Sequence, residues 1–300
     1  MINRRMVVAA LASAPLAPKL ASAQPARLHK TIPSTGETVP AVGMGTWLTF
    51  DVGANAGLRR TRLDVTRTFF ELGGAIIDSS PMYGSSQDVL GYALENLVYP
   101  SQLFAADKVW IRGGENGPAQ VAQTRRRWGV ESFDLLQVHN LVSWRAHLDT
   151  LFSMKAEGRL RYVGVTSYAG LRYSQIEAIM NEHPLDFIQI TYNLVDRAAE
   201  NRLLPLAQEK GIAVIANRPF RESQLIDAAM RRPLPEMAAD IGAQNWAQFL
   251  LKFIISHPAI TAAIPATRRV DHMRENMGAL TGPMPDAAFR QQMAEEATKL

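Results

Sequence analysis

Four side chains that can carry or move a proton stand where predicted β-strands end. An apolar run, GAII, ends at the carboxylate Asp78, and the phenol Tyr83 follows five residues later. The next apolar run ends beside Lys108, and the one after it ends at His139. Because the parallel strands of a closed sheet end at one rim, the four side chains are predicted to meet there.

This set of side chains suits the delivery of a proton to an oxygen that is gaining negative charge. Tyr83 is the predicted acid, because the nearby ammonium of Lys108 stabilises the phenolate and lowers the pKa of the phenol. A lysine at an apolar strand end is costly to desolvate unless a carboxylate lies beside it, and Asp78 is the candidate partner. His139 can donate a hydrogen bond to the same substrate oxygen and polarise a carbonyl.

Other reaction classes fit these residues less well. The four include no nucleophile with an adjacent base, which disfavours acyl transfer. The sequence has no H-E-x-x-H spacing and no cysteine, which disfavours a metal site and excludes disulfides. Carbonyl reduction remains, and it needs a hydride from outside. Taken singly, each residue also has an ordinary role, as a helix cap, a surface ring, a solvated lysine or a hydrogen-bonded histidine.

The rest of the chain alternates short apolar β-type runs with amphipathic helical segments. Such alternation implies a parallel sheet, and eight units match a closed (β/α)₈ TIM barrel of the α/β class. No G-x-G-x-x-G motif occurs, which counts against an open dinucleotide-binding sheet. The predicted strands are residues 41–46, 74–78, 103–109, 133–139, 161–167, 186–192, 212–218 and 260–265.

Two stretches fall outside this repeat. Residues 28–41 carry the turn sequence S-T-G between two β-like runs, which predicts an N-terminal β-hairpin at the barrel bottom. Residues 220–244 form a proline-interrupted insertion after the seventh strand, and we expect it to fold over the strand ends. No linker divides the chain, so residues 24–300 are predicted to be a single domain.

The first 23 residues differ in composition from the rest. They carry Arg4 and Arg5 near the start, continue with an alanine-rich apolar segment and end in the small residues A-S-A. This pattern predicts an export signal peptide of the twin-arginine type and a periplasmic location. A disordered basic tail on a cytoplasmic protein is the alternative.

Charge and hydropathy limit the possible partners. Without the first 23 residues, Lys plus Arg falls from 32 to 29 against 28 Asp plus Glu, so the formal charge falls from +4 to +1. A nearly neutral chain gives no reason to predict a nucleic-acid partner. No apolar run reaches the roughly 20 residues that a membrane-spanning helix needs. The sequence leaves the oligomeric state open and is compatible with a monomer.

Longer motifs resemble those of a known family. The block GGAIIDSSPMYGSSQDVLG resembles the aldo-keto reductase pattern G-x-x-x-D-T-A-x-x-Y-G-x-S-E-x-x-L-G, with Gln87 where Glu is usual. RRWGVESFDLLQVHN resembles the family's L-x-R-L-G-x-D-Y-I-D-L-x-x-x-H block, and EGRLRYVGVTSY, QITYN and IPATRRVDHMRENMGA follow in the family's order. The resemblance covers the chain from about residue 28 to the last helix. It implies a carbonyl reductase whose catalytic tetrad is Asp78, Tyr83, Lys108 and His139.

The resemblance also implies a nicotinamide cofactor. Gln189 and Ser167 fall where the family holds the carboxamide, with Ser167 in place of the commoner Asn and Thr166 in place of Ser. Asn217 replaces the tyrosine on which the nicotinamide ring stacks. The implied cofactor-binding residues are Thr46, Thr166, Ser167, Gln189, Asn217, Thr267, Arg268, Arg269, Glu275 and Asn276.

The region near the C-terminus bears on the choice of cofactor. Ala266 and His272 replace the lysine and arginine that usually hold the adenosine phosphate. Thr267, Arg268 and Arg269 lie beside them, where other branches of the superfamily use Ser or Thr and Arg. Arginine suits a 2′-phosphate, so NADP(H) is the predicted cofactor and NAD(H) the alternative.

Two tryptophans are implied substrate-pocket residues, and the function itself has an alternative. Trp47 follows the first strand and Trp110 lies two residues after Lys108, although both are also compatible with a purely structural role. The altered residues Ser167 and Asn217 motivate a second hypothesis, a nucleotide-binding redox sensor or partner subunit with little turnover.

Overall fold

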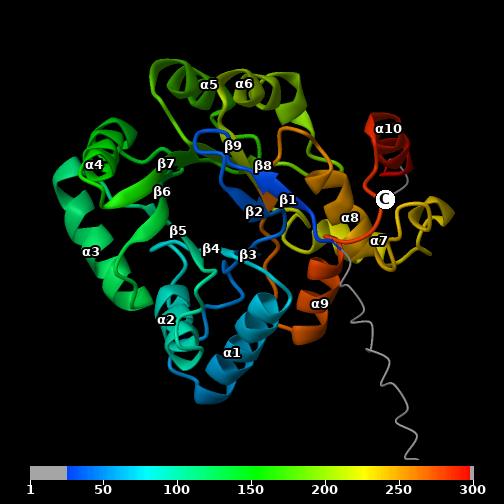
Figure 1. Cartoon of the computed structure of the whole chain (residues 1–300), viewed down its shortest axis with the longest axis horizontal. Helices are drawn as coiled ribbons and strands as arrows, with labels where there is room; N and C mark the ends of the chain where they lie inside the picture. Colours follow the sequence, from blue (N-terminus) through cyan, green and yellow to red (C-terminus); the bar gives the residue numbers. More distant parts are fainter. Residues whose placement is uncertain (1–25, 298–300) are drawn as a thin grey trace, which may run out of the picture.

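The eight predicted strands form one parallel sheet. The computed structural model describes residues 26–297. From β3 to β10 each strand is hydrogen-bonded to the next along the chain (Figure 1). Parallel bridges from Val42 to Ala263 and from Gly45 to Ala266 join the first strand to the last. The sheet therefore curls round into the predicted (β/α)₈ barrel. Its strands are β3 (Met44–Gly45), β4 (Ile76–Asp78), β5 (Phe104–Val109), β6 (Phe133–His139), β7 (Leu160–Thr166), β8 (Phe187–Thr191), β9 (Ala213–Asn217) and β10 (Ala262–Ala263).

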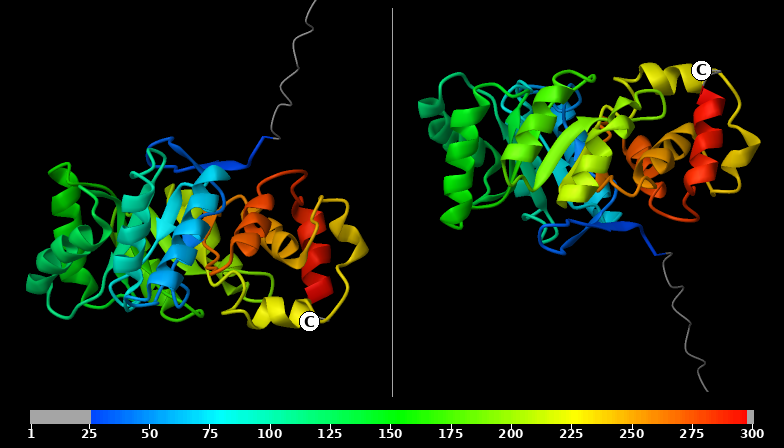
Figure 2. Two further views of the ribbon diagram at one scale, coloured as in Figure 1. Left: turned by 90° about the horizontal axis from the view of Figure 1, so that it is seen from below. Right: turned by 90° about the horizontal axis from the view of Figure 1, so that it is seen from above.

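Helices surround the sheet and connect successive strands (Figures 1 and 2). The first begins where the side chain of Asn55 accepts a hydrogen bond from the backbone N–H of Leu58, which satisfies a free donor of the first turn. Short 3₁₀ turns occur at Gly114–Asn116, Ala198–Asn201 and Glu236–Ala238. The helices are α1 (Ala56–Glu71), α2 (Ser86–Asn96), α3 (Gly117–Trp128), α4 (Trp144–Ala156), α5 (Tyr173–Glu182), α6 (Leu203–Lys210), α7 (Gln224–Ala229), α8 (Trp246–Ile255), α9 (Val270–Gly278) and α10 (Ala287–Glu296).

The predicted hairpin closes the end of the barrel where the strands begin. Strands β1 (His29–Thr31) and β2 (Thr38–Pro40) pair antiparallel, and the connection turns at Gly36 with φ +79°. Ile32 and Val39 belong to the apolar cluster that fills the barrel interior. The Tyr162 hydroxyl, inside the barrel, donates to the Glu37 carboxylate at 2.5 Å. The hairpin lies on one side of the ring of strands in both views of Figure 2, which confirms its predicted place.

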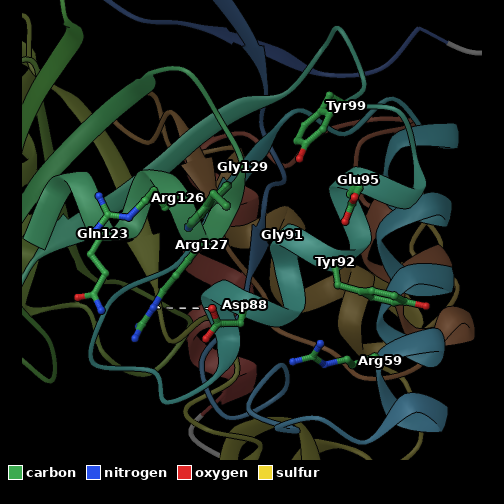
Figure 3. Close-up of a pocket in the computed structure, with 11 residues that line it drawn as sticks. Arg59, Asp88, Gly91, Tyr92, Glu95, Tyr99, Gln123, Arg126, Arg127 and Gly129 are labelled. Atoms are coloured by element: carbon green, nitrogen blue, oxygen red, sulfur yellow. Dashed lines mark ion pairs between the residues drawn. The ribbon is translucent and has the colours of Figure 1, made fainter.

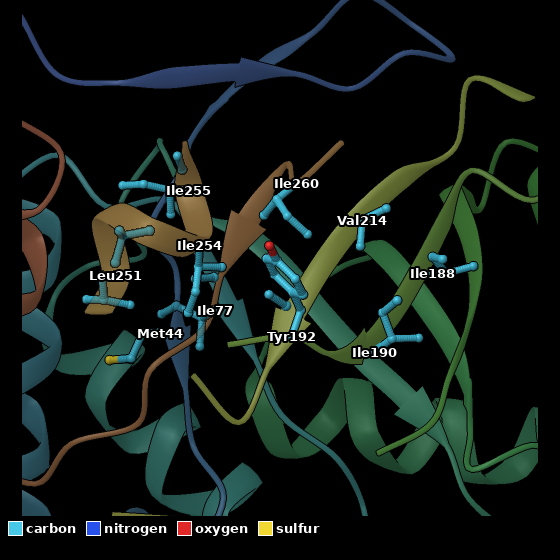
Figure 4. Packing of buried hydrophobic residues seen from close by; sticks show 14 of the residues in the cluster. Met44, Ile77, Ile188, Ile190, Tyr192, Val214, Leu251, Ile254, Ile255 and Ile260 are labelled. Atoms are coloured by element: carbon cyan, nitrogen blue, oxygen red, sulfur yellow. The ribbon is translucent and has the colours of Figure 1, made fainter. Parts of the chain in front are cut away.

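Strand alternation divides the apolar residues into two cores. One cluster fills the barrel interior, and a larger one lies between the sheet and the helices. Figure 4 shows part of the outer core, where Leu251 and Ile254 of α8 pack near Ile77 of β4. Because both faces of every barrel strand are apolar, a polar side chain inside the barrel is an exception that needs a partner.

The insertion at residues 220–244 does not take its expected place over the strand ends. It contains α7, which packs against α8 beside the ring of strands (Figure 1). Leu225, Ala229 and Ile241 are buried in the outer core. These apolar side chains hold the segment against α8, and the mouth of the barrel stays uncovered by α7.

The predicted export signal, residues 1–23, lies outside the described residues. Within residues 26–297, no helix is long and apolar enough to cross a bilayer. In the same part of the chain, no group of three or more His, Asp or Glu side chains is placed to hold a metal ion.

Strand β5 places two charged residues on opposite faces of the sheet. Lys108 points into the barrel, and Asp107 points outward to α2 and α3, fully buried. The Asp107 carboxylate accepts from Gln87 Nε2 at 3.0 and 3.1 Å and from Trp128 Nε1 at 2.6 Å. Burial raises the pKa of Asp107 to about 7, while the charge of Lys108 opposes this rise. The amide at position 87 thus supplies a donor where the usual glutamate would place a second buried carboxyl.

Replacing this amide by a carboxyl is expected to destabilise the fold. Gln87→Glu should lower the free energy of unfolding by about 2 to 4 kcal/mol near pH 8, because two buried carboxyls then face each other. Burial holds the folded-state pKa of the new carboxyl above its unfolded value, so the loss grows as pH rises and is smallest near about pH 5. Urea unfolding at both pH values measures the difference.

The double variant Gln87→Glu/Asp107→Asn is the matched control for this prediction. It again holds one carboxyl and one amide, so it should recover more than half of the lost stability. If the single variant unfolds at the parent urea concentration near pH 8, the two groups do not interact as described.

Candidate active site

The four residues predicted from the strand ends lie together at the carboxyl ends of β4, β5 and β6. Lys108 Nζ lies 2.5 Å from Asp78 Oδ2 and 2.7 Å from the backbone oxygen of Ser79. Both charged side chains are almost completely buried. The neighbouring strands β4 and β5 provide the two partners, as the spacing predicted.

Tyr83 lies in the loop after β4 and faces both Lys108 and His139. The Lys108 ammonium is 5.1 Å from the centre of the Tyr83 ring, whose edge-to-face contact with the His139 ring spans 5.6 Å between centroids. Burial raises the pKa of Tyr83 to about 12; Lys108 lowers it, and Asp78 raises it. Lys108 therefore lowers the pKa of Tyr83 as predicted, but desolvation raises this pKa by more. At neutral pH the phenol holds its proton.

His139 ends β6 and is neutral. Burial and then the charge of Lys108 hold the pKa of His139 well below its usual value. Its Nδ1 lies 2.7 Å from the hydroxyl of Ser80. The sequence reasoning missed this partner, although a hydroxyl two residues after Asp78 was visible.

Besides its ion pair with Lys108, Asp78 is linked by hydrogen bonds to three predicted cofactor-binding residues. Its second oxygen accepts from Gln189 Nε2 at 2.9 Å. Gln189 Oε1 in turn accepts from the Thr166 hydroxyl at 3.0 Å. The Thr46 hydroxyl donates to the backbone oxygen of Asp78 at 3.0 Å. All three are buried; Thr46, just after β3, and Gln189 of β8 contact Asp78 directly, and Thr166 of β7 contacts it through Gln189.

Two of the residues predicted to lie at the nicotinamide end, Ser167 and Asn217, bind the protein's own backbone. The Ser167 hydroxyl donates to the backbone oxygen of Leu171 at 2.6 Å. Asn217 Nδ2 donates to the backbone oxygen of Ser167 at 2.9 Å, and Asn217 Oδ1 accepts from Thr191 Oγ1 at 2.7 Å. Asn217 therefore ties the loop after β7 to the ends of β8 and β9.

The residues near the C-terminus gather at the start of α9. Thr267 Oγ1 accepts from the backbone N–H of Arg269 at 3.2 Å, and Arg269 forms an ion pair with Asp271. Arg268 is exposed and makes no hydrogen bond or salt bridge to any residue that the structure describes. Glu275 and Asn276 follow within α9.

A second cation, which the sequence reasoning missed, lies on α1, the helix that packs against α9. Arg62 of α1 is buried, and its Nε donates to the backbone oxygen of Thr49 at 2.5 Å. Burial and then the charge of Arg268 lower the pKa of Arg62. Arg62 lies within α1 and Arg268 just before α9, and neither has a carboxylate partner in residues 26–297, so both cations suit a phosphate.

Large apolar side chains surround the mouth of the barrel. Trp47 is half-buried after β3, and Trp110, after β5, is 41% exposed. The loops after the strand ends hold six of the ten most exposed large apolar side chains in the described part of the chain. These six are Leu48, Met82, Trp110, Tyr168, Leu171 and Val195.

A separate cleft of about 750 Å³ lies on the outer side of the barrel. Residues of α1, α2 and α3 line it, and within it Arg127 forms an ion pair with Asp88 (Figure 3). None of the predicted active-site residues lines this cleft, so it is distinct from the barrel mouth.

Comparison with known proteins agrees with the barrel and its motifs. The Aldo/keto reductase family profile matches residues 41–294. Methylglyoxal reductase YeaE of Escherichia coli (strain K12) is 29% identical over 261 residues, which cover 84% of this chain and 89% of that protein. The NADH-specific methylglyoxal reductase of the same organism is 28% identical over 242 residues, covering 69% and 72%.

Solved structures of similar proteins share the architecture. An aldo/keto reductase from Klebsiella pneumoniae in complex with NADP and acetate has a TM-score of 0.74 at 23% identity, covering 87% of this chain and 93% of that one. A thermostable aldo-keto reductase in complex with the inhibitor epalrestat has a TM-score of 0.75 at 26% identity, covering 89% and 99%. Since the family profile spans most of the chain and the fold agrees, this protein belongs to the aldo/keto reductase family.

Proposed function

We propose that this protein reduces an aldehyde or ketone to an alcohol, with NADPH as the preferred source of hydride. The observation that carries the proposal is a buried chain of contacts: Asp78 pairs with Lys108, Lys108 lies over the Tyr83 ring, and that ring contacts His139. A phenol held over a buried ammonium is a proton donor whose anion is stabilised as it forms.

Each side chain then has one task. A carbonyl oxygen bound between Tyr83 and His139 gains negative charge as the reaction proceeds, and Tyr83 gives it a proton. Lys108 stabilises the phenolate that results, and Asp78 fixes the ammonium in place. The neutral imidazole donates a hydrogen bond that orients and polarises the carbonyl. A reduced nicotinamide, when bound, supplies the hydride.

The cofactor is proposed to lie across the ends of β7 to β10 and of β3, which closes the barrel beside β10. Gln189, Thr166 and Thr46 surround Asp78 and are candidates for the nicotinamide end. Thr267, Arg268 and Arg62 are candidates for the phosphate at the adenosine end. The cations favour NADPH, although one relative is named as NADH-specific.

The exposed apolar side chains at the mouth favour a substrate with an apolar body. Leu48, Met82 and Trp110 follow three neighbouring strands on the side of Asp78 and Lys108. Exposed apolar side chains that gather at one place on a protein surface often mark a ligand-binding site. The relatives named above reduce methylglyoxal, a small and polar aldehyde, so a substrate panel should include both kinds.

Removal of one oxygen atom tests the proposed acid. Tyr83→Phe is expected to lower kcat for NADPH-dependent aldehyde reduction by about 10²- to 10⁴-fold, because the proton donor is lost while the ring stays. Absorbance of NADPH at saturating aldehyde measures the rate. Tyr92→Phe, in the outer cleft, is the matched control and should keep the parent rate.

The same assay separates an enzyme from a sensor. Continuous consumption of NADPH over many turnovers supports the reductase, whereas a single turnover followed by a stop supports a redox sensor or partner subunit. A Tyr83→Phe variant as fast as the parent would contradict the assigned acid.

Truncation of Arg268 tests the choice of cofactor. Arg268→Ala is expected to raise the KM for NADPH about 10-fold or more while changing the KM for NADH less than about 3-fold, because only NADPH carries the 2′-phosphate. Initial rates with each nucleotide give both values. Arg125→Ala, at the end of α3, is the control, and equal losses for the two nucleotides would contradict a phosphate contact.

A further inference from the structure

We propose that Ser80 is a positioning residue that holds His139 in the tautomer with its proton on Nε2. In this state the imidazole presents a hydrogen-bond donor to the carbonyl oxygen before any substrate binds. The inference rests on the proposed function, since the donor matters only if His139 orients a carbonyl.

The contact between the two residues is short and shielded from water. Ser80 Oγ lies 2.7 Å from His139 Nδ1, and both residues are buried. The backbone N–H of Met82 points at the same hydroxyl, with 3.2 Å between Met82 N and Ser80 Oγ. The loop that delivers Tyr83 therefore also fixes the position of Ser80.

The hydrogen-bond partners of Ser80 select the direction of its bond to His139. Its oxygen accepts from the N–H of Met82, and within residues 26–297 the only acceptor within reach of its buried hydroxyl hydrogen is Nδ1 of His139. A proton on Nδ1 would leave that hydroxyl hydrogen buried without a partner. Nδ1 then acts as the acceptor, so a neutral imidazole must carry its only proton on Nε2.

The surroundings of His139 keep the ring neutral. The titratable groups around it are Tyr83 from the loop after β4, which contacts the ring, Lys108 from β5, which lies over the Tyr83 ring, and Asp78 from β4, which pairs with Lys108. Burial disfavours a second proton on the ring, and the charge of the Lys108 ammonium opposes it further. With one proton to place, the bond from Ser80 decides which nitrogen holds it.

The other ring nitrogen faces the mouth of the barrel. Nε2 makes no hydrogen bond to residues 26–297. Since it is also absent from the fully buried polar atoms that have no partner, some of its surface must be exposed. It is therefore accessible from the mouth, where the substrate carbonyl is proposed to bind.

The pattern that the block around Asp78 resembles offers no such hydroxyl. The pattern D-T-A-x-x-Y-G has alanine at the position of Ser80, and a methyl group makes no hydrogen bond. Because packing fixes Ser80, the His139 ring is already oriented and needs less reorganisation when it donates to the carbonyl oxygen.

Nuclear magnetic resonance of the ring nitrogens tests the tautomer directly. In protein labelled with ¹⁵N-histidine, the His139 signals, assigned by their loss in His139→Gln, should show the proton on Nε2 in the parent protein. In Ser80→Ala, the same ring should show a mixture of tautomers or the proton on Nδ1. A parent protein with the proton on Nδ1 overturns the inference without any variant.

Kinetics with NADPH and 4-nitrobenzaldehyde test the consequence. Ser80→Ala should lower kcat about 10- to 100-fold with an unchanged Kd for NADPH, and Ser80→Thr, which keeps the hydroxyl, should recover most of the rate. Ser85→Ala removes a nearby hydroxyl that binds Asp51 instead, and should change neither the tautomer nor kcat more than about 2-fold.

The outcomes separate this inference from the function on which it rests. If Tyr83→Phe abolishes turnover while Ser80→Ala keeps the parent rate and the Nε2 tautomer, only the role of Ser80 is wrong. If Tyr83→Phe leaves turnover unchanged, the proposed chemistry is wrong, and the nitrogen signals still decide the tautomer.

Discussion

The buried ion pair between Lys108 and Asp78 is the interaction on which the rest of the barrel mouth depends. Two charges removed from water are costly, and they are tolerated only when their remaining hydrogen-bonding capacity is filled. Lys108 also donates to the backbone of Ser79, and Asp78 also accepts from Gln189. Loss of either charge would leave the other uncompensated in an apolar barrel, so the polar residues around the pair act as one unit.

The closed sheet makes this unit possible because successive side chains of a strand point alternately into the barrel and towards the helices. Residues 104, 106 and 108 of β5 point into the barrel, and the residues between them point to the helices. Asp107 and Lys108 are therefore neighbours in sequence with different partners, one held by Gln87 and Trp128 and the other by Asp78. The hairpin closes the opposite end with Ile32 and Val39, so access is confined to the end where the ion pair lies.

Sequence patterns predicted the features that depend on periodicity and failed for those that depend on side-chain direction. The strand ends at Asp78 and His139 followed from apolar runs, and a barrel brings such ends together whatever the loops do. The bonds from Ser80 to His139 and from Gln189 to Asp78 depend on loop backbone and rotamers, which no spacing reveals. The insertion was misplaced because its apolar residues were known but the helix that they pack against, α8, was not.

The pKa of Tyr83 shows why the acid need not be tuned as strongly as its residue types suggest. Lys108 was expected to lower this pKa, yet burial brings it to about 12. The acceptor, however, is the oxygen of a forming alkoxide, and an alcohol is a much weaker acid than a phenol. Proton transfer from Tyr83 to that oxygen therefore remains favourable although burial raises the pKa of the phenol. Burial thus keeps the proton on Tyr83 until the carbonyl oxygen becomes basic. The charge of Lys108 keeps the pKa of Tyr83 from rising further.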